Sequence, residues 1–218
     1  VRITNGDSLT GTVTLTHIAG LQGTAGWVDG SFASARFNGL LGMEFFYGVS
    51  STYRRVVAGL IVGETQWGFR ARAVDLRSQQ VRTVLGDGTD PYASVGVEGT
   101  GTTPGVKARP VAIHEFWLGM SYLFAQEGAN CIMEAVSNET TATPYNSSTW
   151  VWTSSRFAGV CETTMSATSI DGDALTQAHF SDPVGSGVVR DASGAPVAVV
   201  VTNYQDPNRL RRIYPLYP

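Results

Sequence analysis

The segment Gly23–Phe37, GTAGWVDGSFASARF, decides how the fold of this 218-residue chain is interpreted. It is too short and too rich in small residues to form a helix, and it contains no metal-ligand cluster and no phosphate-binding lysine. Its order recurs, because Asp171-Gly172 and Ala178–Phe180 repeat the Asp-Gly and Ala-x-Phe of the segment. The segment is therefore predicted to belong to an internal repeat.

Three glycines, Gly20, Gly86 and Gly159, anchor the predicted copies of the repeat. The middle copy is the weakest: it keeps Leu-Gly-Asp-Gly at residues 85–88 and places Lys107 where the other copies have phenylalanine. The Asp-Gly pairs predict turns with positive φ. The copies are expected at approximately residues 1–76, 77–136 and 137–218, packed in an open array or as two lobes whose boundary the sequence does not place.

The composition and the short apolar segments predict an all-β fold. The chain has 25 glycines, Thr12–Ile18 alternates between β-branched and other residues, and Val197–Val201 is apolar and flanked by turn residues. Segments with helical periodicity are few, which argues against an α-rich fold.

Two strand-like segments carry a family resemblance. NRLRRI at Asn208–Ile213 and NCIM at Asn130–Met133 resemble the end of an NHL-type β-propeller repeat, and residues 158–183 resemble its other half. Val1–Gly20 is similar to an NHL hairpin in which a final strand precedes the first strand of the next blade. The resemblance implies three blade-like repeats in an open or bilobed arrangement, because three copies cannot close the ring of six blades that such repeats usually form.

The two cysteines acquire a predicted partner from this resemblance. In the NHL pattern, Cys131 and Cys161 lie at the base of one hairpin, which implies a disulfide; two buried thiols are the alternative. Two sequons, at Asn138 and Asn146, lie between them and predict glycosylation. Together these features favour a secreted or cell-surface protein.

No motif in the sequence indicates a catalytic centre. The three histidines, His17, His114 and His179, occupy different positions of the repeat, and no metal-binding spacing is present. The net charge of −3 does not favour nucleic acid as a partner. The expected protein is not an enzyme and has no cofactor or metal.

Four residues are the candidates for partner contacts. Trp150 and Trp152 alternate along one predicted strand and so share a face, and tryptophan is enriched at binding hot spots; burial in the core is the alternative. Arg209 and Arg211 likewise share a face, where they serve either as contacts or as the charges of a protected edge strand.

A three-copy NHL-like ectodomain with one disulfide and sequons is similar to the insect-stage surface antigens of African trypanosomes. This resemblance implies a non-enzymatic cell-surface module that recognises a protein or peptide partner at the host or vector interface. It also implies a membrane anchor in a segment absent from this sequence. The alternatives are a fragment of an intracellular NHL-type scaffold and a metal-dependent propeller lyase or hydrolase.

Overall fold

The computed structural model consists of antiparallel β-sheets. It describes residues 2–4, 14–49, 55–65, 68–89, 98–102, 106, 108–117, 121–137, 151–162, 169–205 and 209–214. Strands are the only regular secondary structure in these ranges, and none of their sheets closes into a barrel. The predicted all-β class is confirmed. No helix that could cross a membrane is present among the described residues.

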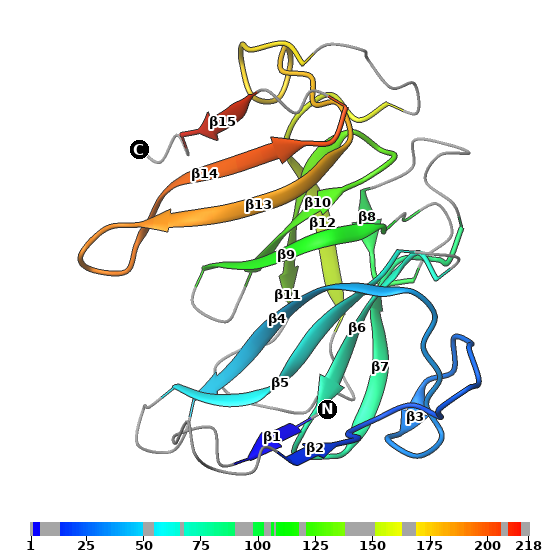
Figure 1. The fold of residues 1–218 in the computed structure, drawn as a ribbon. Helices are drawn as coiled ribbons and strands as arrows, with labels where there is room; N and C mark the ends of the chain where they lie inside the picture. The colour runs from blue at the N-terminus through cyan, green and yellow to red at the C-terminus, as the bar shows by residue number, and fades with distance from the viewer. Residues whose placement is uncertain are drawn as a thin grey trace.

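Three consecutive meanders make up most of the molecule (Figure 1). The first sheet has the order β3-β7-β6-β5-β4, with β3 Gly30–Ser31, β4 Leu40–Val49, β5 Arg55–Glu64, β6 Arg70–Asp75 and β7 Gln80–Leu85. The second has the order β8-β12-β11-β10-β9, with β8 Gly99–Thr100, β9 Pro110–Trp117, β10 Ser121–Gln126, β11 Cys131–Ser137 and β12 Trp152–Ala158. The third has the order β13-β14-β15, with β13 Pro183–Arg190, β14 Pro196–Asn203 and β15 Leu210–Ile213.

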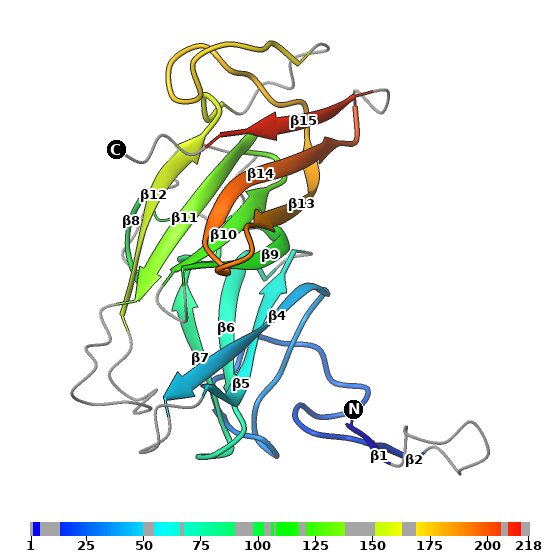
Figure 2. The same cartoon turned by 90° about the vertical axis from the view of Figure 1, so that its left-hand side faces the viewer.

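The sheets stack in chain order and share two apolar cores (Figures 1 and 2). Ile61 of the first sheet and Phe124 of the second belong to one core, and Leu123 of the second sheet and Val201 of the third belong to the other. The first long strands of neighbouring sheets, β4, β9 and β13, contact each other in sequence. Burial on both faces of the middle sheet explains why the inner strand β10 is buried throughout and is apolar between Ser121 and Gln126.

The units of the fold begin at the anchor glycines. We call residues 20–85 unit 1, residues 86–158 unit 2 and residues 159–213 unit 3. The boundaries expected after residues 76 and 136 would instead cut two sheets, because β7 pairs with β6 and β12 pairs with β11. Gly86 and Gly159 each follow the fourth strand of a meander, so that strand belongs to the unit before the glycine.

A short hairpin of β1 (Arg2–Thr4) and β2 (Thr14–Thr16) precedes unit 1. The hairpin expected within Val1–Gly20 is present, but its second strand does not join the meander of unit 1. β2 leads to Gly20 as β7 leads to Gly86 and β12 leads to Gly159, so β2 takes the position of a fourth strand.

Candidate functional site

The anchor glycines have the same local geometry in all three units. The φ angles of Gly20, Gly86 and Gly159 are +97°, +98° and +88°, and their N–H groups donate to the carbonyls of Phe32, Gly101 and Ala174 at 2.9, 3.1 and 2.7 Å. A Cβ on Gly159 would lie 2.5 Å from the ring of Phe180. A positive φ and this close approach both require glycine. The structure therefore confirms that these three glycines are equivalent.

A second glycine of each unit follows an acidic residue. Gly30, Gly99 and Gly172 have φ angles of +142°, +146° and +158° and follow Asp29, Glu98 and Asp171. Each is two residues before the carbonyl that binds the anchor glycine. The expected assignment of Asp87-Gly88 to this position in the middle copy is wrong, since the φ of Gly88 is +83°.

The residue that packs on the anchor glycine also differs in the middle unit. Phe37 lies against Gly20 and Phe180 against Gly159, whereas Ala108 lies against Gly86. Ala108 therefore takes the phenylalanine position that the sequence had given to Lys107, which lies outside the described residues. The equivalent residue therefore lies one position later in the chain than the motif predicts.

Arginines bind the acidic residues of units 1 and 3. Arg72 on β6 lies 2.8 Å from Asp29, and Arg211 on β15 lies 2.5 Å from Asp171. Each guanidinium also lies over the phenylalanine ring of its unit, at 5.2 Å for Arg72 and 4.9 Å for Arg211. Arg211 also donates to the carbonyls of Ile170 and His179.

These contacts change the role expected for the two candidate arginines. Arg211 is only 8% exposed because its donors are used on the loop of its own chain, so it is not a free surface cation. Arg209 is exposed and donates to the carbonyl of Ser169 at 3.2 Å. Both arginines face the loop that precedes β13, so the predicted shared face is correct, but both hold that loop in place.

Trp152 is a core residue. It is 1% exposed and stacks on Tyr122 with ring centroids 5.0 Å apart. The expectation of an exposed contact is wrong for this tryptophan because alternation along a strand does not tell which face another sheet covers. Trp150 and the sequon residues Asn138 and Asn146 lie outside the described residues.

The predicted disulfide is present. Cys131 at the start of β11 is bonded to Cys161 after β12, with Cα atoms 5.1 Å apart. Because β11 and β12 are antiparallel neighbours, the bond lies at the base of their hairpin, as the NHL pattern implied.

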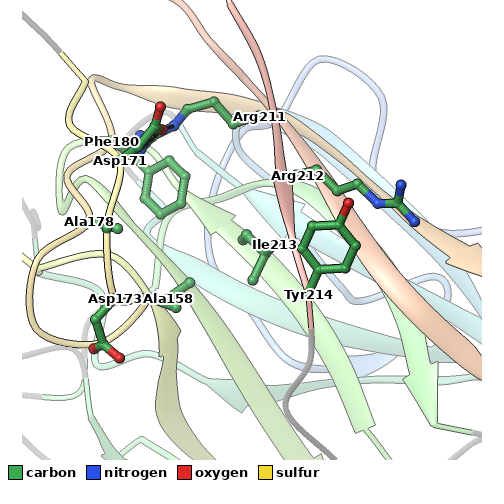
Figure 3. A pocket seen from close by; sticks show the side chains of 11 residues that line it. Ala158, Asp171, Asp173, Ala178, Phe180, Arg211, Arg212, Ile213 and Tyr214 are labelled. Atoms are coloured by element: carbon green, nitrogen blue, oxygen red, sulfur yellow. Dashed lines mark hydrogen bonds and ion pairs between the residues drawn. The ribbon is translucent and has the colours of Figure 1, made fainter.

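A pocket of about 320 Å³ lies beside β15 (Figure 3). Its walls come from the end of β12, the loop before β13 and β15, with the lining residues Ala158, Asp171, Gly172, Asp173, Ala174, Ala178, Phe180, Arg211, Arg212, Ile213 and Tyr214. Arg211 lies with Asp171 and Phe180 at one end, while Ile213 lies between β15 and the loop.

The pocket occupies the position of a fourth strand. In unit 1, β7 lies between β6 and Gly30, and in unit 2, β12 lies between β11 and Gly99. In unit 3, no described strand lies between β15 and Gly172, and both line the pocket instead. We call this space between β15 and Gly172 the open slot.

The acidic residue of each unit indicates what the open slot can bind. Asp29 accepts the backbone N–H of Thr83 on β7, and Glu98 accepts that of Arg156 on β12, both at 3.0 Å. No described strand offers Asp171 such a donor, and its side chain is 80% exposed against 47% for Asp29. The open slot therefore presents the carboxylate of Asp171 at the position where the acidic residues of units 1 and 2 accept a hydrogen bond from the fourth strand.

The titratable groups elsewhere are paired separately. His114 lies 3.8 Å from Glu44, and His179 lies 2.9 Å from Glu162, while His17 is exposed. No cluster of three His, Cys, Asp or Glu side chains suited to a metal ion occurs in the described part of the chain.

Two of the described carboxyl groups have a pKa that burial raises above its ordinary value. Burial raises the pKa of Glu64, and the charge of Arg72 and the N–H of Asn38 offset it only in part. Burial also raises the pKa of Asp182, against the opposing N–H of Gly128. Both residues lie outside the open slot, and their acidity reflects the interior of the units.

Comparisons with known proteins add little to this geometry. No family model and no curated protein matches the chain. One similar solved structure is a structural genomics protein of unknown function from Bacteroides thetaiotaomicron, with a TM-score of 0.30 and 11% identity. The match covers 90% of this chain and 60% of that one, so this chain corresponds to less than two thirds of that protein.

Proposed function

We propose that the chain is a non-catalytic module that recognises a protein or peptide partner by taking an extended segment of it into the open slot. The observation that carries this proposal is the equivalence of the slot to the positions of β7 and β12. The partner segment then becomes the fourth strand of unit 3, and the three units are blades of an open propeller. Addition of a strand to a sheet edge is an established mode of peptide recognition.

The lining of the slot defines the segment that fits. In unit 1, Val81 pairs with Gly30 and packs in one cluster with Ala35. Ala178 takes the position of Ala35 in unit 3 and lines the pocket together with Ile213. The bound segment therefore places an apolar side chain against these two residues. The second residue after it donates its N–H to Asp171, as Thr83 does to Asp29.

The proposed location is the cell surface or another oxidising compartment. The Cys131–Cys161 bond supports it, because structural disulfides persist outside reducing cytosol. An extracellular binding module on a membrane-anchored protein also fits the resemblance to surface antigens described above.

A direct test uses the strand that fills the equivalent position in unit 1. A fluorescein-labelled synthetic peptide of residues Gln79–Gly86 is titrated with the protein, and fluorescence polarisation reports binding. We expect saturable binding with one peptide per chain. Replacing the threonine of the peptide by proline removes the N–H for Asp171, and Asp171→Asn weakens the acceptor. Each should lower affinity about tenfold or more, since a hydrogen bond to a charged group contributes about 1.5–3 kcal/mol.

The matched control is Asp191→Asn, an exposed aspartate in the turn between β13 and β14, which should leave affinity unchanged. Thermal unfolding checks that Asp171→Asn keeps the loop folded. If the peptide does not bind, or if a scrambled peptide binds equally well, the proposed function is wrong.

A further inference from the structure

The hairpin before unit 1 contains a strand that matches the open slot. Counting back from the anchor glycines, Leu15 of β2 corresponds to Val81 of β7 and Ser154 of β12. Val81 and Ser154 are 0% and 2% exposed, whereas Leu15 is 68% exposed. A fourth-strand residue that is buried in two units is thus uncovered in the hairpin.

We propose that the partner of the open slot is β2 of a second copy of this chain, and that two copies exchange this strand reciprocally. This inference rests on the proposed function, because it names the supplier of the segment. In the exchanged pair, Leu15 of one copy pairs with Gly172 of the other, and the N–H of His17 donates to Asp171. The apolar side chain of Leu15 enters the pocket between Ala178 and Ile213.

The outer faces of units 1 and 3 are the second observation. Met43 of β4 is 60% exposed on the face turned away from unit 2, while Ile113, at the same register position of unit 2, is 1% exposed. Leu210 of β15 is 71% exposed, whereas its counterparts Ala71 and Ile132 are 0% exposed against the following unit.

The exposed face of unit 1 that carries Met43 and the exposed face of unit 3 that carries Leu210 are of the two types that pack together inside the molecule. In each unit that has a successor, the face equivalent to that of Leu210 packs on the face equivalent to that of Met43. A second copy placed after unit 3 brings its unit 1 to that position, with its β2 entering the slot. Two copies of three units then close as a ring of six, within the range of four to eight blades that propellers use, and both ends are buried.

The strand cannot come from the same chain without rebuilding the fold. β1 and β2 lie at the end of the molecule opposite β15 in both views (Figures 1 and 2), and Gly20 fixes the end of β2 to unit 1. In the single copy, β1 holds the edge of β2 through three residue pairs. An isolated two-stranded ribbon of this size is marginal, so β15 of the second copy can replace β1 on that edge.

The closing experiment combines molar mass with a cross-link. Light scattering coupled to size exclusion should give twice the mass of one chain. Thr16 and Arg212 correspond to the directly opposed Arg82 and Ala73 of unit 1, and opposed residues of antiparallel strands suit a disulfide. A mixture of Thr16→Cys and Arg212→Cys chains should therefore form a disulfide-linked dimer on oxidation. A mixture of Thr16→Cys and Ser193→Cys chains is the control and should not.

Leu15→Asp should convert the dimer to a folded monomer, because Leu15 is exposed in the single copy. An excess of the Gln79–Gly86 peptide should do the same by occupying the slot. A monomer that still binds the peptide overturns the exchange and leaves the proposed function intact. A monomer that binds no peptide overturns both. A dimer that lacks the cross-link, or that ignores Leu15→Asp, uses another surface and also overturns the exchange.

Discussion

Units 1 and 2 use different interactions at one equivalent position of their third strands, β6 and β11. Arg72 of unit 1 is paired in register with Val62 and Thr83, and Met133 of unit 2 is paired with Phe124 and Arg156 at the same positions. Arg72 is fully buried and bonds to Asp29 and Glu64. Unit 2 has no arginine there, and the disulfide lies beside Met133 instead, with its two Sγ atoms 3.6 and 3.9 Å from the Met133 sulfur.

A second difference accompanies the first. Glu64 accepts the N–H of Asn38 at 2.9 Å and also binds Arg72, while Gln126 accepts the N–H of Arg109 at 2.5 Å in the equivalent place. The backbone bond is the same, but the acceptor is charged only where an arginine needs a counter-charge. The same position of the fold therefore holds a buried ion pair in unit 1 and lies beside a disulfide in unit 2.

The largest effect is expected from giving unit 1 the residue of unit 2. Arg72→Met leaves Glu64 buried without its cation, and breaking a buried pair on one side costs about 3–5 kcal/mol. The free energy of unfolding, from urea denaturation followed by tryptophan fluorescence, should fall by this amount.

The double variant Arg72→Met with Glu64→Gln tests whether the two positions are coupled, because it gives unit 1 the residues that unit 2 has there, Met133 and Gln126. It should recover at least about half of the loss, since replacing both members of a buried pair is often close to neutral. If the double variant is no more stable than Arg72→Met, the two positions are not coupled and the comparison of the units fails.

The next effect concerns the covalent bond of unit 2. Changing both Cys131 and Cys161 to alanine opens a loop with a sequence separation of 30 residues, which costs about 3.7 kcal/mol in the chain-entropy model. Thermal unfolding should shift to lower temperature by the corresponding amount. The wild-type protein under reducing conditions should show the same shift, while the double variant should not respond to the reductant. A wild type whose stability is indifferent to reduction would mean that unit 2 does not depend on the bond.

The three units differ in how much of their geometry the sequence predicts. Units 1 and 3 keep Asp-Gly, Ala-x-Phe and the arginine, so their glycines and loops could be predicted from the letters alone. Unit 2 replaces these residues with Glu98, Ala108 and Met133, and only φ angles and hydrogen bonds identify them as equivalents. The open slot could not be predicted from the sequence, because it is an unfilled strand position. That position is recognised only from the strand register of units 1 and 2.

The smallest expected effect lies where units 1 and 2 meet. Glu44 on β4 lies 3.8 Å from His114 on β9. Burial acts to raise the pKa of Glu44, but the hydrogen bond and charge of His114 and the N–H of Phe45 together outweigh it, so the pKa is lowered.

A lowered folded-state pKa stabilises the protein above the ordinary carboxyl value of about 4.5, and this stabilisation is lost as the pH falls through the folded-state pKa. Glu44→Gln should therefore lower the free energy of unfolding by no more than about 1 kcal/mol at neutral pH, as for a partly exposed pair. The difference in free energy of unfolding between Glu44→Gln and wild type should shrink towards zero in acid. Urea denaturation at neutral pH and at a pH below the folded-state pKa measures this change. A difference that stays constant with pH would mean that Glu44 acts through its shape and its hydrogen bonds, and that the contact between the two units owes nothing to its charge.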